Sequence, residues 1–72
     1  LRQDIAVTGE LSIRGEIRAV GGIPEKIYGA KQAGIKTVLV PEENRKDVPL
    51  GLKNIEIIPV KNLAEVLRFF KQ

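Results

Sequence analysis

The sequence has 72 residues, of which 43% are hydrophobic and 29% are charged, and its net charge is +3. This balance is typical of a folded globular domain and differs from that of a disordered chain. Cysteine and histidine are absent, which excludes disulfides, thiolate chemistry and a Ser-His-Asp triad. Proton transfer near neutral pH must therefore use Lys, Asp, Glu, Tyr or a backbone group.

The basic side chains are spread along the sequence and interleaved with acidic ones, as in residues 42–47. This pattern predicts a mixed, solvated surface and disfavours a nucleic-acid-binding stripe. No apolar run reaches the roughly 20 residues that a membrane-spanning helix needs. Because residue 1 is Leu1 and not methionine, we expect residues 1–72 to be a piece of a longer protein.

The first half of the chain predicts strands followed by a helix. Residues 5–8 favour a strand, and residues 10–19 alternate between apolar and polar, as in a half-exposed strand or a hairpin bent at Gly15. The glycines at positions 21 and 22 break that pattern. Pro24 then favours the first turn of a helix over residues 24–33, and Gly34 favours the end of that helix.

The second half predicts two further strands and a closing helix. Residues 37–40 favour a short buried strand, Asn44 suits the start of a short turn, and residues 55–58 favour the last strand. Residues 62–65 read as a capping box before the final helix. The order β-β-α-β-β-α predicts an α+β fold of two layers, a sheet with helices packed on it. The predicted core residues are Ile5, Val7, Ile17, Val38, Leu39, Ile57, Val66, Leu67 and Phe70.

Lys26 has an unusual predicted position. At about 100° per residue it falls inside the apolar arc of the helix, between Ala33 and Ile23, and in the first turn. Burial and the helix dipole both disfavour an ammonium there, and a neutral amine is what a general base needs. Alternatively, its stem covers the helix edge while the ammonium reaches water or pairs with Glu25 or Glu10.

Other candidate positions carry weaker signals. Gly21 and Gly22 before a helix suit a phosphate cradle, but the pattern is neither GxGxxG nor a Walker loop, so a tight turn is the favoured interpretation. Ser12, the only serine, lies on the polar face of an alternating segment without a nucleophile elbow. The acidic residues show no spacing typical of a metal site.

Several segments carry family motifs in order: residues 2–10 (RQDIAVTGE), 11–16 (LSIRGE), 21–26 (GGIPEK), 33–41 with Asn44 and Asp47, and Val60 onward. In these motifs the chain resembles the proteolytic domain of Lon-type serine proteases. The resemblance covers essentially the whole chain. It implies a Ser–Lys dyad in which Lys26, the lysine of the Gly-Gly-x-x-x-Lys element, is the catalytic base, and in which Thr8 helps to hold the dyad.

The same resemblance places the nucleophilic serine upstream of Leu1. Residues 1–72 are then expected to be the C-terminal portion of a proteolytic domain, inactive alone. The implied chemistry is acyl transfer: neutral Lys26 takes the proton of the serine hydroxyl, and the resulting ammonium protonates the leaving amine.

The resemblance further implies an ATP-dependent, cytoplasmic endopeptidase that degrades unfolded or damaged proteins and forms a homo-oligomeric, hexameric ring. ATP is expected only at a separate ATPase region of the parent, and no cofactor or metal is expected within residues 1–72. The expected partners are polypeptide substrates and the rest of the protease domain, with no nucleic acid. The alternative is a non-catalytic Lon-like module, as in DNA-repair proteins of the RadA type or magnesium-chelatase-like proteins.

Overall fold

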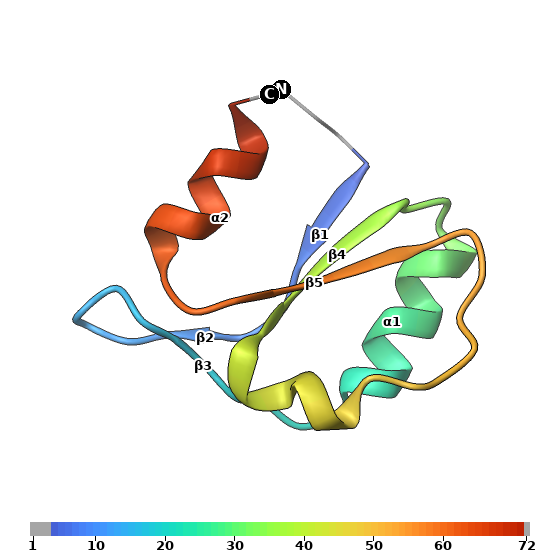
Figure 1. The fold of residues 1–72 in the computed structure, drawn as a ribbon, viewed down its shortest axis with the longest axis horizontal. Helices are drawn as coiled ribbons and strands as arrows, with labels where there is room; N and C mark the ends of the chain where they lie inside the picture. Colours follow the sequence, from blue (N-terminus) through green and yellow to red (C-terminus); the bar gives the residue numbers. More distant parts are fainter. Residues whose placement is uncertain (1–3, 72) are drawn as a thin grey trace.

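The structure, a computed structural model, describes residues 4–71, so that Arg2 and Gln3 of the first motif lie outside the described residues. Its elements in chain order are β1 (Ile5–Val7), β2 (Glu10–Leu11), β3 (Ile17–Arg18), α1 (Ile23–Gln32), β4 (Thr37–Pro41), the 3-10 helix η1 (Glu42–Asp47), β5 (Glu56–Val60) and α2 (Leu63–Phe70) (Figure 1).

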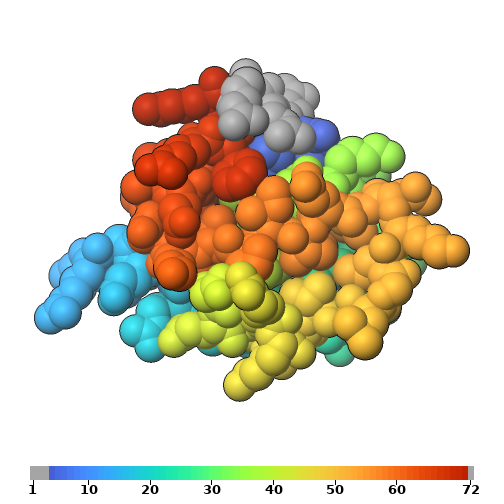
Figure 2. Space-filling model, in the orientation of Figure 1, coloured from blue at the N-terminus to red at the C-terminus, as the bar shows by residue number. Residues whose placement is uncertain are grey.

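The strands form a three-stranded parallel sheet and a separate hairpin. The sheet has the order β1-β4-β5, and its register places Ala6 beside Val38 and Val38 beside Ile57. β2 and β3 pair antiparallel, so the alternating segment over residues 10–19 is a hairpin. The tip of this hairpin, in light blue, projects from the body of the molecule (Figure 2).

Helices cover the sheet on both faces (Figure 1). Side chains alternate along a strand, so Leu39 packs in a cluster with Val66 of α2, while Val38 and Val40 pack with Ile27 of α1. All five residues of β4 are buried, as expected for a parallel strand covered on both sides. The mixed α/β class is confirmed, but the expected two layers become three because the helices take opposite faces.

The predicted core is confirmed at five of its nine positions, at which the residues are buried: Ile5, Ile17, Val38, Leu39 and Val66. Ile57 and Phe70 are partly buried and pack against this core. Two predictions are wrong, since Val7 is 43% exposed and Leu67 is 48% exposed. Val7 lies in β1, the first strand of the sheet order, and Leu67 lies about 100° around α2 from Val66.

The ends of α1 follow from backbone geometry. Gly22 precedes the helix in the left-handed conformation, with φ 74°, which glycine adopts without a Cβ penalty. At the other end the Gly34 N–H donates to Lys31 O (3.1 Å) and the Ile35 N–H to Ala30 O (3.0 Å). This pair of bonds is a Schellman ending, so the helix ends as the sequence predicted.

The start of α2 was also predicted from its capping residues. Asn62 accepts a hydrogen bond from the Glu65 N–H at 2.9 Å, as an N-cap does. Glu65 reaches back to the Lys61 N–H at 2.6 Å, one residue before the cap. The reciprocal bonds of a capping box are therefore present, with the second one displaced by one residue.

Candidate active site

The two candidate site residues lie at one end of the sheet. Thr8 directly follows β1, and Lys26 lies in the first turn of α1. The N-terminal end of α1 lies at the same end of the sheet as the carboxyl ends of β1 and β4 (Figure 1). In open sheets of parallel strands, binding and catalytic groups collect at this end.

Thr8 is half-buried and fixed to the neighbouring strand β4. Its backbone N–H and its hydroxyl both donate to the carbonyl oxygen of Leu39, at 2.9 and 3.1 Å. With its hydrogen engaged there, Oγ1 is left as a hydrogen-bond acceptor. The local structure therefore gives Thr8 a fixed oxygen that can accept a bond from an amine.

Lys26 is exposed, which corrects the expectation that it lies on the core side of the helix. The buried residues of α1 are Ile23 and Ile27, with Ala30 half-buried. On a helical wheel these lie about 40–100° from Lys26. The buried arc is thus narrower than the apolar pattern indicated, and Lys26 lies beside it.

The Lys26 amine forms no hydrogen bond or ion pair with any residue that the structure describes. The alternative of pairing with Glu25 or Glu10 is therefore not realised, since the ion pairs within residues 4–71 join Arg18 to Glu16 and Glu43, and Arg45 to Glu42. Thr8 and Lys26 are likewise not bonded to each other within that range. The structure brings them to one end of the sheet without joining them.

Ser12 has a local structural role. Its hydroxyl oxygen accepts hydrogen bonds from the Arg14 N–H (3.2 Å) and the Glu16 N–H (3.1 Å). The Gly15 N–H donates to its carbonyl oxygen at 3.0 Å. Ser12 therefore closes the turn of the hairpin, in keeping with the sequence interpretation that it is not a nucleophile.

The glycines at positions 21 and 22 form the tight turn that the sequence favoured. Gly22 is the N-cap of α1, and its carbonyl oxygen accepts the Lys26 N–H at 3.0 Å. The turn leads straight into the first helical turn. The backbone position of Lys26 therefore depends on where this turn is held.

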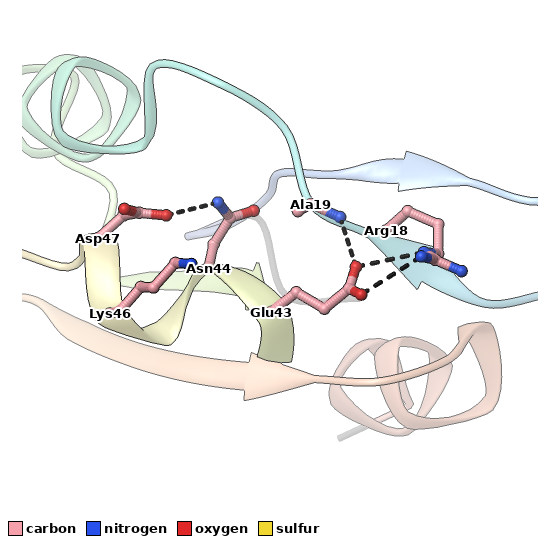
Figure 3. Close-up of a pocket in the computed structure, with 6 residues that line it drawn as sticks. All are labelled: Arg18, Ala19, Glu43, Asn44, Lys46 and Asp47. Carbon is pink, nitrogen blue, oxygen red and sulfur yellow. Dashed lines mark hydrogen bonds and ion pairs between the residues drawn. The ribbon is translucent and has the colours of Figure 1, made fainter.

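A polar depression of about 480 Å³ flanks that turn, lined by Arg18, Ala19, Glu43, Asn44, Lys46 and Asp47 (Figure 3). Asn44 is buried there and bonds to Val20, just before the two glycines. From the sequence, Asn44 was predicted to start a short turn and was part of a family motif, but no bond to Val20 was predicted. Its connection to the helix start depends on a contact across 24 residues, which local pattern does not reveal.

Within residues 4–71, no three acidic side chains come together as a group that could hold a metal ion. No helix in that range is long and apolar enough to cross a membrane. The groups at the candidate site are a lysine amine, a threonine hydroxyl and the polar groups around the start of α1.

Comparison with known proteins identifies similar sequences. The family described as the Lon protease (S16) C-terminal proteolytic domain matches residues 1–71. Similar proteins include the "Archaeal Lon protease" of Pyrococcus abyssi, 53% identical over 93% of this chain. The "Lon protease" of Brucella suis and that of Trichlorobacter lovleyi are 49% and 46% identical over 94% of this chain. The chain spans only 7–9% of the length of these relatives.

Proposed function

The chain belongs to the family of Lon protease C-terminal proteolytic domains, and we propose that it supplies the lysine base of a Ser–Lys dyad in a serine endopeptidase. The serine of this dyad comes from outside residues 1–72, because Ser12 is the only serine in the chain and serves the hairpin turn. Residues 1–72 are then the C-terminal portion of the proteolytic domain.

The observation that best supports this proposal is that the Lys26 amine is exposed and unpaired among residues 4–71. It is exposed at the end of the sheet where parallel strands collect functional groups. No carboxylate among residues 4–71 pairs with it. The amine is thus free to meet a hydroxyl that another segment brings to this face.

The proposed chemistry is acyl transfer in two proton steps. Neutral Lys26 accepts the proton of the serine hydroxyl as the serine oxygen attacks the scissile carbonyl carbon. The resulting ammonium then donates that proton to the nitrogen of the leaving amine as the peptide bond breaks. Water repeats the cycle on the acyl-serine ester, with Lys26 again as the base.

Thr8 is proposed to orient the lysine. Because the Thr8 hydroxyl donates to Leu39 O, its oxygen can only accept from the amine. An amine that donates one N–H to Thr8 keeps its lone pair available for the serine proton. Thr8 would thereby hold Lys26 in the conformation that faces the nucleophile.

The activity of the whole protein is part of the same proposal. It would be an ATP-dependent endopeptidase of the cytoplasm, assembled as a homo-oligomeric ring and acting on unfolded or damaged polypeptides. ATP would act at a separate region, since the chain spans less than a tenth of its relatives. The names of those relatives, all Lon proteases, support the proteolytic part of this proposal.

The test is replacement of Lys26 by methionine in the intact parent protein, with hydrolysis of casein and of a fluorogenic peptide as the measurement. Methionine keeps the stem of the side chain and removes the amine, so activity should be lost while the fold remains. Lys31→Met is the matched control, because Lys31 is an exposed lysine in the last turn of the same helix. An active Lys26→Met parent would contradict the proposal, and a wild-type parent without peptidase activity would favour the non-catalytic module.

A further inference from the structure

Asn44 is a polar residue buried to 4% exposure in η1. Its side-chain oxygen accepts the Val20 N–H at 2.9 Å, and its Nδ2 donates to Val20 O at 3.0 Å and to Asp47 Oδ2 at 2.8 Å. The amide has only one orientation that satisfies these contacts, because Val20 O and the Asp47 carboxylate are both acceptors. Asn44 therefore forms hydrogen bonds with both backbone polar groups of Val20.

Glu43 holds the two residues before Val20 in the same way. Its carboxylate accepts the Ala19 N–H at 3.0 Å and pairs with the Arg18 guanidinium at 3.2 and 3.3 Å (Figure 3). We call the side chains of Glu43, Asn44 and Asp47 the η1 clamp. It fixes the chain over residues 18–20, where β3 ends.

The clamp acts directly before a segment that has little rigidity of its own. Gly21 and Gly22 follow Val20, and neither has a side chain to restrict its backbone. The Val20 side chain packs against the buried cluster that contains Ile23 and Ile27. Val20 is therefore fixed to η1 by its backbone and to α1 by its side chain, and the helix start is held between them.

We propose that Asn44 is a positioning residue for Lys26, acting through Val20 and the two-glycine turn. This inference rests on the proposed function, since it assigns a role relative to the proposed base. The Lys26 N–H bonds to Gly22 O at 3.0 Å, so the turn and the lysine backbone move together. Because Asn44 bonds both the N–H and the carbonyl oxygen of Val20, it fixes the position of the first turn of α1. The position that the Lys26 amine can occupy is fixed with it.

The test uses Asn44→Asp in the intact parent. Aspartate has the shape of asparagine and still accepts the Val20 N–H, but its second oxygen faces Val20 O and the Asp47 carboxylate without a hydrogen to donate. We expect kcat for a fluorogenic peptide to fall about 10–100-fold, as for a misplaced catalytic group. KM should change less than about twofold, because Asn44 is not proposed to contact substrate.

A second variant separates positioning from folding. In the double variant Asn44→Asp/Asp47→Asn, the amide introduced at position 47 donates to the carboxylate introduced at position 44, which removes the repulsion between two carboxylates. Thermal stability should recover, whereas kcat should stay low because Val20 O still lacks its donor. Recovery of kcat together with stability would show that Asn44 serves only folding, and would overturn the proposal.

Two further variants keep the test decisive if these proteins do not fold. Glu43→Ala removes an exposed part of the clamp, and it should lower kcat less than Asn44→Asp while speeding hydrogen exchange over residues 19–26. Glu42→Gln is the matched control, because among residues 4–71 Glu42 pairs only with Arg45 in the same 3-10 helix; it should leave kcat and exchange unchanged. Unchanged kcat in Glu43→Ala despite faster exchange would overturn the proposal.

Failure of this inference can be told apart from failure of the proposed function. If Lys26→Met keeps its activity, the lysine is not the base and the proposed function fails, whatever Asn44 does. If Lys26→Met is inactive while a folded Asn44→Asp keeps full kcat, the base stands and only the positioning role fails.

Discussion

Gly9 lies so close to Ile17 that any side chain at position 9 would have to displace its neighbours. A Cβ at this glycine would be 2.7 Å from Ile17 Cγ2 and 2.8 Å from Pro41 Cγ, and the Gly9 φ is +121°. The glycine thus lets the chain turn from β1 into the hairpin while Ile17 and Pro41 close over it. Position 9 therefore has a packing requirement directly after Thr8, the residue proposed to hold the dyad lysine.

We predict that Gly9→Ala lowers the free energy of unfolding by about 2–4 kcal/mol, the sum of backbone strain and overpacking. Denaturant unfolding of the intact proteolytic domain measures this change. Gly29→Ala is the control, because a Cβ there meets nothing within 4 Å. That control should raise stability by about 0.5–1 kcal/mol, as expected for alanine replacing glycine in a helix. Equal effects of the two substitutions would contradict the close packing at Gly9.

The two apolar positions Val38 and Leu67 should respond very differently to truncation. Val38 is fully buried in β4 and Leu67 is 48% exposed on α2. Val38→Ala should therefore cost about 2 kcal/mol of unfolding free energy through the cavity it leaves. Leu67→Ala should cost less than about 1 kcal/mol, because much of its side chain already contacts water. A larger loss at Leu67 in the intact parent would show that another segment covers this flank of α2.

Local signals in the sequence predicted most of the fold. The helix expected over residues 24–33 is observed as Ile23–Gln32, because proline and glycine mark its ends by local geometry. The capping residue Asn62 identified the start of α2 for the same reason. The layering was not predictable in this way, since the placement of the helices depends on which face of the sheet each connection crosses.

The candidate site was predictable only in part. The apolar pattern placed Lys26 in the buried arc of α1, whereas the sheet buries a narrower arc around Ile23 and Ile27. The role of Asn44 depends on its bonds to Val20, 24 residues away. The spacing of apolar residues in the sequence does not predict such a contact. The assignment of Lys26 as the dyad base and of Thr8 as the residue that supports it came from the family resemblance and stays a prediction.

Removal of the α2 cap offers a test of the observed helix start. Asn62→Ala should lower the free energy of unfolding by about 1 kcal/mol, because the Glu65 N–H loses its acceptor. Asn62→Asp keeps an acceptor at the same place and should keep nearly the full stability. Thermal or denaturant unfolding of both variants measures the difference, and equal loss in both would mean that the loss does not come from the missing hydrogen-bond acceptor.

The Thr8 hydroxyl can be tested apart from the backbone bond at the same residue. Thr8→Val keeps the branched shape and the bond from the backbone N–H to Leu39 O, which is 2.9 Å long. It removes the hydroxyl, which donates to Leu39 O and whose oxygen is proposed to accept from the Lys26 amine. Stability should fall by no more than about 1 kcal/mol, the usual worth of one hydrogen bond.

Peptidase activity of the intact parent should respond far more strongly than stability. Without the Thr8 oxygen the Lys26 side chain is free to rotate away from the serine, so kcat should fall about 10–100-fold in Thr8→Val. Thr8→Ser restores an oxygen at the same position and should regain most of that loss. Thr8→Ser keeps the hydroxyl bond to Leu39 O but loses the methyl group, so the two variants should differ little in stability and strongly in activity. If kcat instead follows stability across this pair, Thr8 acts through the fold alone and does not orient the lysine.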